Sequence, residues 1–325
     1  MRKIRIATRS SPLALMQATN VAALLSSHLK NIGSRVFDPD IKLEVAETFA
    51  DKRLDIPISG LGMQGAFVKE VEANVLSGKA DLAVHSAKDL PSSVSEEGLI
   101  LAGVTARADP RDVLLGCTME EMPEGARVAT GSLRRKLQLQ ALRPDLDIVG
   151  LRGNIATRIN KIPPNGAIVI AKAALDRLGI DIPAAKSSIL SVNDMLPQVG
   201  QGTLAITAKS TDSDLLELLD GISDESARFI LLAERSFLAH IGGSCDAPAA
   251  AYGEIDSSDG TRKVFLRALL AADGDTVLIR RSRLGDDPVA VGRDLAAELQ
   301  KIAKTYDGGP SSSGAALIRT DGDWS

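Results

Sequence analysis

Positive charge gathers at two turns of the chain, although the whole sequence carries a net charge of -4. Between Arg127 and Lys161 there are eight Lys or Arg residues and only two acids. The segments 130–135 (Thr-Gly-Ser-Leu-Arg-Arg) and 152–158 (Arg-Gly-Asn-Ile-Ala-Thr-Arg) each follow an expected strand and begin an expected helix. Cations at a helix N-terminus are unfavourable by roughly 0.3–1 kcal/mol each, because that end already carries unpaired N–H groups and partial positive charge. We therefore expect these turns to bind an anion with several carboxylates or phosphates.

The first expected strand-to-helix turn has a similar arrangement. Arg9 and Ser10 follow the strand, and Ser11 with Pro12 has the form of a helix N-cap and first helical residue. Ligands of open α/β sheets usually bind at such turns, and an arginine fork can hold a carboxylate through two hydrogen bonds. Taken alone, an exposed arginine beside an ordinary cap is an equally good interpretation. Three turns of this kind together favour an anion site.

A lysine and an aspartate follow another short apolar strand, in the segment 84–91 (Val-His-Ser-Ala-Lys-Asp-Leu-Pro). Pro91 restricts helix formation, so Lys88 and Asp89 are expected on a loop. As a surface ion pair they would contribute little to stability. Among arginines, however, Asp89 would stay ionised and could stabilise a cationic intermediate or transfer protons.

The two cysteines differ in their surroundings. Cys117 follows an apolar strand and is interpreted as a small buried hydrophobe, whereas Cys245 lies in a glycine-rich turn at 242–248. A cysteine in such a turn is a candidate nucleophile or attachment point, although no partner histidine is evident. No Cys/His spacing suits zinc, so we expect no metal. The segment 60–65 does not follow a strand directly and lacks a P-loop ending, which disfavours a nucleotide cofactor.

Composition narrows the classes of protein. With 325 residues, 44% hydrophobic and 25% charged, the chain is expected to form two or three soluble globular domains. Aromatic residues make up 3% and Trp occurs once, which disfavours nucleic-acid binding. No apolar run is long enough to span a membrane and no signal peptide is evident, so we expect a cytoplasmic protein. We also expect a monomer that acts on a small molecule.

Strands alternate with helices through most of the chain, which predicts an α/β fold with largely parallel sheets. A small α+β unit is expected after Cys245. The loop at 49–65 is long enough to be a lid, the segment 198–202 is expected to be a flexible crossover, and the tail from Asp307 is expected to be weakly ordered. The expected strands are 4–7, 41–48, 80–84, one near Val113, 127–129, 147–150, 167–171, 249–255, 263–272 and 275–283, and the expected helices are 12–30, 66–76, two from Leu133 and Ile155, one to Leu178, 225–240 and 288–304.

Six segments together resemble the porphobilinogen deaminase (hydroxymethylbilane synthase) family, in the order in which that family has them. They are 5–15 (Arg-Ile-Ala-Thr-Arg-Ser-Ser-Pro-Leu-Ala-Leu), 84–91, 131–135, 151–154 (Leu-Arg-Gly-Asn), 200–202 (Gly-Gln-Gly) and 243–245 (Gly-Ser-Cys). The resemblance extends to about residue 255. It implies three domains: 1–104 with 203–220, 105–202, and 221–325. The first two would resemble the lobes of type II periplasmic binding proteins with a cleft between them, and the third would be a small α+β domain.

The resemblance also implies a reaction. Four porphobilinogen molecules would be joined head to tail with loss of ammonia, giving the linear tetrapyrrole hydroxymethylbilane. The chain would grow on a dipyrromethane cofactor attached through a thioether to Cys245. Each pyrrole carries an acetate and a propionate, so arginine-rich turns suit a chain that gains two negative charges with each ring.

Residue roles follow from the same resemblance. Asp89 and Lys88 are the expected catalytic residues. The expected cofactor-binding residues are Cys245, Lys88, Asp89, Thr130, Ser132, Arg134, Arg135 and Arg152, and the expected substrate-binding residues are Arg9, Ser11, Arg152, Arg158, Arg177 and Gln201. Thr207 stands where the family often has an acid, and Gly60 and Gln64 stand where many members have lysines.

Two other functions remain open on the sequence. A non-catalytic two-lobe protein that binds a small dicarboxylate would share the fold and the arginine turns. A cysteine-dependent acyl transferase would use Cys245, but no histidine base is evident.

Overall fold

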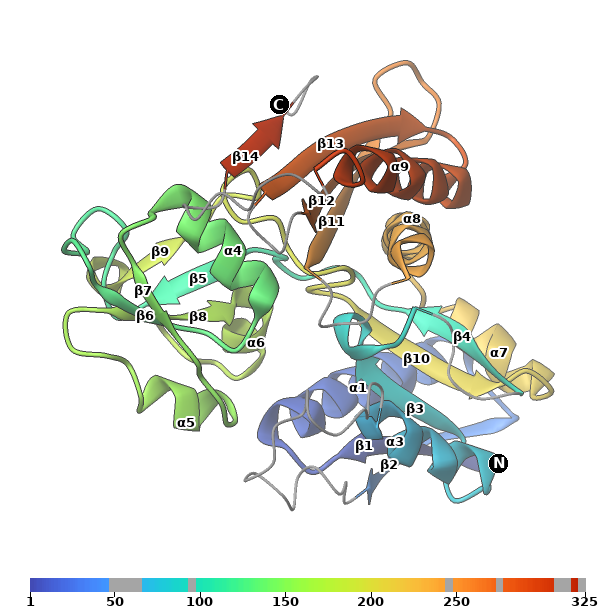
Figure 1. Ribbon diagram of the computed structural model, residues 1–325. Helices are drawn as coiled ribbons and strands as arrows, with labels where there is room; N and C mark the ends of the chain where they lie inside the picture. The colour runs from blue at the N-terminus through green and yellow to red at the C-terminus, as the bar shows by residue number, and fades with distance from the viewer. Residues whose placement is uncertain (47–65, 93–97, 243–247, 273–276, 307–316, 321–325) are drawn as a thin grey trace. The chain divides into compact units, whose positions relative to one another are not determined.

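The computed structural model describes residues 1–46, 66–92, 98–242, 248–272, 277–306 and 317–320. The chain forms two compact units, residues 1–108 with 203–228 and residues 109–202 with 229–325, which are coloured along the chain in Figure 1. In the described part of the chain, no helix has both the length and the apolar character to cross a membrane.

The first unit, called lobe 1, is built on a five-stranded sheet in the order β2-β1-β3-β10-β4. Its elements are β1 (Arg2–Arg9), α1 (Pro12–Ile32), β2 (Phe37–Ala46), α3 (Ala66–Leu76), β3 (Leu82–Ser86), β4 (Leu99–Val104), β10 (Leu204–Lys209) and α7 (Ser213–Asp220). Strand β10 runs antiparallel to β3 and β4, while β1 is parallel to β2 and β3. Alternation along β1 places Ile6 against α1 and α7 and Ala7 against α3, so helices cover both faces.

The second unit contains a sheet of the same design, called lobe 2, in the order β7-β6-β8-β5-β9. Its elements are β5 (Asp112–Leu115), β6 (Arg127–Ala129), α4 (Leu133–Leu142), β7 (Asp147–Val149), α5 (Ile155–Ile159), β8 (Ala167–Ala171), α6 (Lys172–Arg177) and β9 (Ser187–Ile189). Strand β5 is antiparallel to β8 and β9, and the other described pairs are parallel.

Both lobes therefore place an antiparallel strand fourth in the sheet, and in each case a connecting segment supplies it. Strand β10 follows the whole of lobe 2 in sequence, and β5 directly follows the first part of lobe 1. The ligand-binding edge of such a sheet is at the C-terminal ends of its parallel strands. The predicted α/β fold class, with two α/β lobes and a small α+β part, is confirmed.

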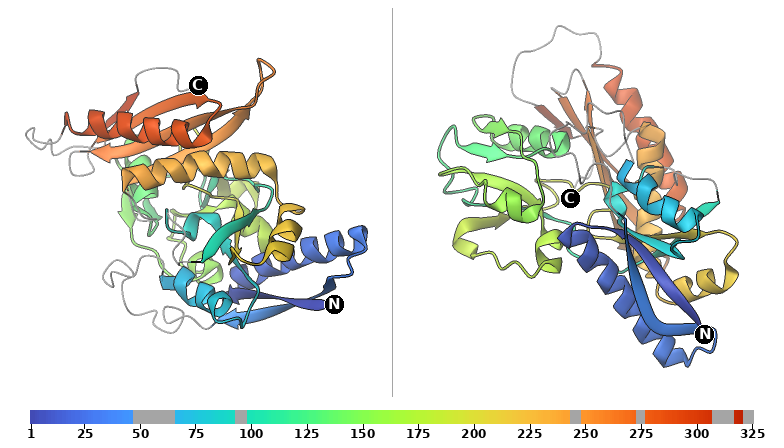
Figure 2. Two further views of the ribbon diagram at one scale, coloured as in Figure 1. Left: turned by 90° about the vertical axis from the view of Figure 1, so that its right-hand side faces the viewer. Right: turned by 90° about the horizontal axis from the view of Figure 1, so that it is seen from below.

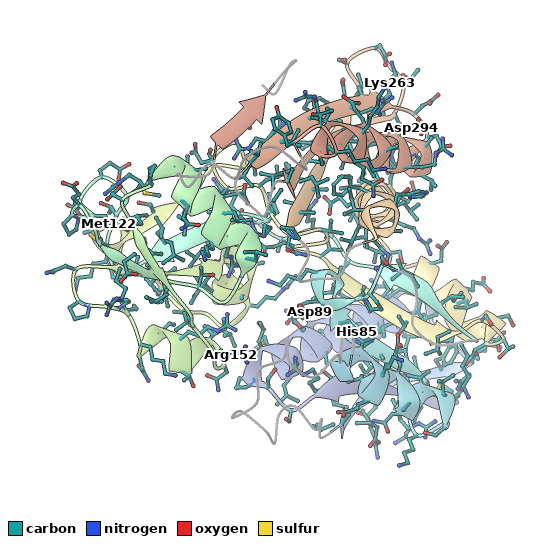
Figure 3. The ribbon with its side chains drawn as sticks, viewed as in Figure 1. His85, Asp89, Met122, Arg152, Lys263 and Asp294 are labelled. Atoms are coloured by element: carbon teal, nitrogen blue, oxygen red, sulfur yellow. The ribbon has the colours of Figure 1, made fainter. Side chains whose placement is uncertain are left out.

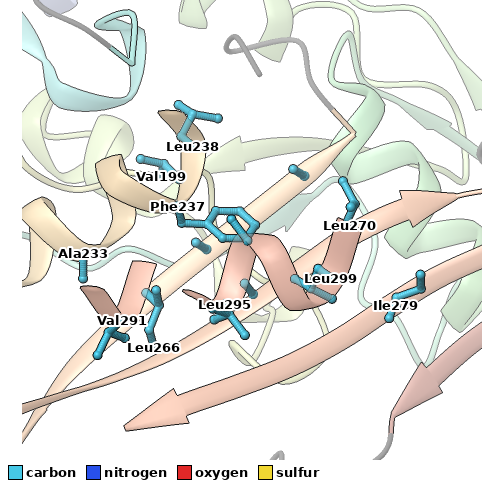
Figure 4. Packing of buried hydrophobic residues seen from close by; sticks show 14 of the residues in the cluster. Val199, Ala233, Phe237, Leu238, Leu266, Leu270, Ile279, Val291, Leu295 and Leu299 are labelled. Carbon is cyan, nitrogen blue, oxygen red and sulfur yellow. The ribbon is translucent and has the colours of Figure 1, made fainter. Parts of the chain in front are cut away.

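A third sheet, in the order β11-β12-β13-β14, belongs to the same unit as lobe 2. Its elements are α8 (Glu225–Ile241), β11 (Ala249–Asp256), β12 (Lys263–Ala272), β13 (Val277–Gly285), α9 (Pro288–Ala303) and β14 (Leu317–Thr320). One face packs against α8 and α9 around Phe237 and Leu295, as Figures 2 and 4 show. The other face, through Leu269 and Leu278, packs against Leu137 of α4.

Expectations about two irregular segments need correction. Residues 317–320 of the tail expected to be weakly ordered form β14, which pairs in parallel with β13, while 307–316 and 321–325 lie outside the described residues. The crossover at 198–202 is buried rather than flexible, and Gly200 and Gly202 have φ values of 71° and 93° that favour glycine. The Glu234 carboxylate accepts hydrogen bonds from the backbone N–H groups of Gly200 (2.7 Å) and Gly253 (2.9 Å), which anchors the crossover to α8 and β11.

Candidate functional site

The edge of lobe 1 brings Arg9, Ser11, Lys88 and Asp89 to the ends of two neighbouring strands. Arg9 is the last residue of β1, and β3 is followed directly by the 3₁₀ turn η2 (Ala87–Asp89). Because β1 and β3 are adjacent and parallel, their C-terminal ends meet at the same edge. Ser11 caps α1 as predicted, since its Oγ accepts a hydrogen bond from the Ala14 N–H (3.3 Å).

Lys88 and Asp89 lie in the 3₁₀ turn, not in the irregular loop that the sequence suggested. The Ala87 N–H donates to the Thr203 carbonyl on the strand side (3.0 Å), and Ala87 and Leu90 are buried. Ser86, which precedes the turn, accepts a hydrogen bond from Gln17 of α1 (2.8 Å). The turn is thus fixed by its buried residues, while the Asp89 side chain is exposed (Figure 3).

A buried polar cluster lies next to this turn. His85 Nε2 is 3.4 Å from Thr207 Oγ1 of β10 and 4.0 Å from Glu72 Oε1 of α3. Burial, assisted by the positive charge of Arg9, lowers the pKa of His85 to about 4. The imidazole is therefore neutral near pH 7. Because His85 contacts α3 and β10 and immediately precedes Ser86, it links these two elements to the turn that carries Asp89.

In lobe 2 the two arginine-rich turns lie side by side. The Thr130 N–H donates to Val149 at the end of β7 (2.8 Å), and a Cβ atom on Gly131 would come within 2.7 Å of the Leu151 carbonyl oxygen. Ser132 caps α4 through Arg135 N–H (3.4 Å), and Asn154 caps α5 through Thr157 N–H (2.9 Å). The predicted helix starts are confirmed, and Thr130, Ser132 and Arg152 share one edge of the sheet.

Three arginines of lobe 2 differ in exposure. Arg152 is exposed at the second turn (Figure 3), while Arg158 is half-buried and donates from Nε to the Gly153 carbonyl (2.7 Å). Arg177, at the end of α6, donates from Nη2 to the Gly202 carbonyl (2.6 Å). Burial lowers the pKa of Arg177. Arg177 is thus held at the buried crossover, and Arg152 is the most accessible of the three.

Arg134 and Arg135 point into the protein, where both contact Asp112. Arg134 Nη2 lies 2.7 Å from Oδ2, and Arg135 Nη2 lies 2.8 Å from Oδ1. All three side chains are buried. The anion expected at this turn from sequence is, for these two side chains, supplied by the protein itself. Asp112 was missed, although an acid that begins an otherwise apolar strand (Val-Leu-Leu) was a usable signal.

Gln201, an expected substrate-binding residue, also contacts Asp112. Its Nε2 donates to Asp112 Oδ1 (2.8 Å) and to the Pro110 carbonyl (2.7 Å). Burial alone would raise the pKa of Asp112, but the charges of Arg135 and Arg134 outweigh it and hold that pKa well below its usual range. The carboxylate is therefore ionised, and the cluster of two cations and one anion keeps one positive charge in excess.

The charges and donors of these side chains suit a carboxylate-bearing ligand at this edge of lobe 2. Arg134 Nε is buried and has no hydrogen-bond partner among the described residues. A buried excess charge and a buried unused donor are both costly unless an anion completes the site. Within the described residues, no group of three His, Cys, Asp or Glu side chains could hold a metal ion.

Cys245 and the segment 49–65, with Gly60 and Gln64, lie outside the described residues. Cys245 falls between the end of α8 and the start of β11, at Ile241 and Ala249.

A family model described as porphobilinogen deaminase, dipyromethane cofactor binding domain, matches residues 4–217, and a second, for the C-terminal domain of porphobilinogen deaminase, matches residues 229–301. The chain belongs to the porphobilinogen deaminase family. The porphobilinogen deaminase of Roseiflexus sp. (strain RS-1) is 41% identical over 300 residues, which cover 90% of this chain and 94% of that protein. That of Syntrophomonas wolfei is 41% identical over 308 residues, which cover 92% and 95%.

Among solved structures, YhfZ from Shigella flexneri matches over 74% of this chain and 96% of its own chain, with 18% sequence identity and a TM-score of 0.35. Similarity this low carries no argument about the site. The family match confirms the resemblance stated from the sequence, including a domain that binds the dipyrromethane cofactor.

Proposed function

We propose that this chain is a hydroxymethylbilane synthase, a transferase that joins four porphobilinogen molecules head to tail with loss of ammonia. The observation that carries the proposal is the fixed turn that presents the exposed Asp89 carboxylate at the same sheet edge as Arg9, in a chain of the porphobilinogen deaminase family. The carboxylate lies at the sheet edge where ligands of α/β folds bind.

Asp89 acts on the reacting pyrrole. Loss of ammonia leaves porphobilinogen as an electron-poor azafulvene with cationic character, and a fixed carboxylate stabilises that charge through the pyrrole N–H. The same oxygen accepts the proton released when the new carbon–carbon bond forms. Lys88, the neighbouring residue in the turn, takes part in catalysis and binds the cofactor. Arg9 and Ser11, at the adjacent strand end, bind carboxylates of the incoming substrate.

The edge of lobe 2 binds carboxylates of both the cofactor and the substrate. Thr130, Ser132, Arg134, Arg135 and Arg152 bind the cofactor, and Arg152, Arg158, Arg177 and Gln201 bind the substrate; Arg152 is the exposed cation at the two adjoining turns. Cys245 carries the dipyrromethane cofactor through a thioether. The cofactor supplies the primer on which the chain grows.

The three sheets support a division into three domains, 1–104 with 203–220, 105–202, and 221–325. The protein works in the cytoplasm as a monomer, on a small-molecule substrate, without nucleic acid, membrane or metal.

Intact mass tests the proposal. The purified protein should weigh more than its sequence by one dipyrromethane, and Cys245→Ser should have the plain sequence mass and no activity, because the thioether sulfur is removed. The measurement is electrospray mass spectrometry together with the formation of hydroxymethylbilane from porphobilinogen. A plain mass in folded wild-type protein would favour the dicarboxylate-binding protein, and a Cys245-dependent acyl adduct would favour the acyl transferase.

A further inference from the structure

Asp112 has no role in the function proposed above, yet it is the centre of the buried cluster in lobe 2. Its Oδ1 accepts hydrogen bonds from Arg135 Nη2 (2.8 Å) and Gln201 Nε2 (2.8 Å). Its Oδ2 accepts from Arg134 Nη2 (2.7 Å) and Arg135 Nε (3.2 Å). An ionised carboxylate has about four lone-pair positions, and four donors occupy them. Asp112 therefore acts through these side chains and not on a ligand directly.

The two arginines differ in the number of hydrogen bonds that they donate to Asp112. Arg135 grips Asp112 through both Nε and Nη2, and its Nη1 donates to the Val169 carbonyl (3.0 Å). Arg134 makes a single bond to Asp112, and its Nη1 donates to the Leu196 carbonyl (2.5 Å), while its Nε is a buried donor with no partner among the described residues. Arg135 thus fixes the position of the carboxylate, and Arg134 is the arginine whose Nε–H remains available to an additional acceptor.

We infer that Asp112 is the positioning residue of this arginine pair: it fixes both guanidinium groups before a carboxylate-bearing ligand arrives and leaves one positive charge to receive it. The inference rests on the proposed function. Two neighbouring guanidinium groups repel each other when buried together, so without Asp112 they would separate or turn away. A ligand would then have to order them as it binds, which weakens binding.

The effect should appear in binding more than in chemistry. Asp112 lies behind the groups that contact the ligand, as the outer partners of metal ligands do, and loss of such partners usually lowers affinity by about 10- to 100-fold. A purely structural residue would lower stability without a selective effect on KM.

The decisive variant is Asp112→Asn in the full-length protein, which keeps the shape of the side chain and removes its charge. We expect the fraction of molecules carrying the cofactor mass to fall, and KM for porphobilinogen in the loaded fraction to rise by about 10-fold or more with a smaller change in kcat. Asp145→Asn is the matched control, because Asp145 pairs with Arg143 in the same lobe at a half-exposed position. Cofactor loading and KM of the control should match those of the wild type.

Asp112→Ala provides a second test that does not depend on activity. The deleted carboxylate leaves space beside two guanidinium groups, so formate should raise the melting temperature of Asp112→Ala and increase its cofactor loading, whereas chloride at equal ionic strength should not. Normal loading and a KM within about twofold of wild type in Asp112→Asn would overturn the inference, as would the absence of any formate effect in Asp112→Ala. Wild-type protein without the added mass would overturn the proposed function instead, and the formate response of the melting temperature would still decide the role of Asp112.

Discussion

At the scale of single residues, charge is used in two distinct ways. Asp89 is exposed on a turn that buried neighbours hold in place, whereas Asp112 is buried and its oxygens are occupied by two arginines and a glutamine. The exposed Asp89 carboxylate can contact a ligand, while the buried Asp112 carboxylate can only orient the side chains around it. Burial, and not residue type, separates the two roles.

Replacement of the Asp89 carboxylate by an amide should lower turnover strongly but leave the fold intact. Asp89→Asn keeps the shape of an exposed side chain, so the melting temperature should change little. An amide has no negative charge to stabilise the cation and does not accept the proton released when the carbon–carbon bond forms, so kcat should fall by about 10²–10⁴-fold. Single-turnover measurements with porphobilinogen would check this, and retained turnover would remove Asp89 from the reaction.

The residue scale also shows what sequence could and could not provide. Ser11 was predicted as a helix cap because a cap contacts an N–H group only three residues away, and the helix start at Leu133, which Ser132 caps, was predicted from the same local pattern. The partner of Arg134 and Arg135 could not be found in this way, because Asp112 is more than twenty residues from both and nearly ninety from Gln201. Contacts at such separations depend on the fold and leave no local spacing to read.

At the scale of elements, the close approach of two turns sets the binding edge of lobe 2. Gly131 lies against the Leu151 carbonyl oxygen, so the turn that starts α4 and the turn that precedes α5 touch through backbone atoms. The strand-to-helix alternation around them was predicted from sequence, and so were the starts of α4 and α5. Strands β4, β9 and β10 were not predicted. Strand β10 pairs with β3 and β4 and β9 pairs with β5, so their partners lie far away in the chain.

A methyl group at Gly131 should push the two turns apart. Gly131→Ala would place its Cβ 2.7 Å from the Leu151 oxygen, and overpacking of this kind usually costs about 1–3 kcal/mol of stability. Urea unfolding and the extent of cofactor loading would measure the effect. Gly150→Ala is the control, because a Cβ there meets no atom within 4 Å. Equal stability and loading in the two variants would contradict the role of the contact.

At the scale of the whole molecule, buried titratable groups connect stability to pH. His85 is neutral in the fold and its pKa is lowered to about 4 by burial and by Arg9, while an unfolded histidine has a pKa of about 6.5. Between these values the unfolded chain binds a proton that the folded protein does not. Stability is therefore lost as the pH falls through this window, and the contribution of His85 is constant above it.

We expect the contribution of His85 to the free energy of unfolding to fall by about 1.4 kcal/mol for each pH unit below about 6.5, or by about 3 kcal/mol down to about pH 4. His85→Gln removes the titrating group, so the free energy of unfolding of the variant should depend less steeply on pH than that of the wild type. Urea unfolding from about pH 4 to about pH 7 would compare the two slopes. Parallel curves would show that the imidazole is protonated equally in the folded and unfolded states.

The antiparallel fourth strand of lobe 1 has a consequence for biosynthesis. β10 becomes available only after all of lobe 2 has been synthesised, because it begins at Leu204. Until then β3 and β4 lack the strand that separates them, and their unpaired edges can pair with other chains. The N-terminal part of this protein therefore cannot fold completely before the rest is synthesised, because translation must pass Lys209 before the sheet of lobe 1 can be completed.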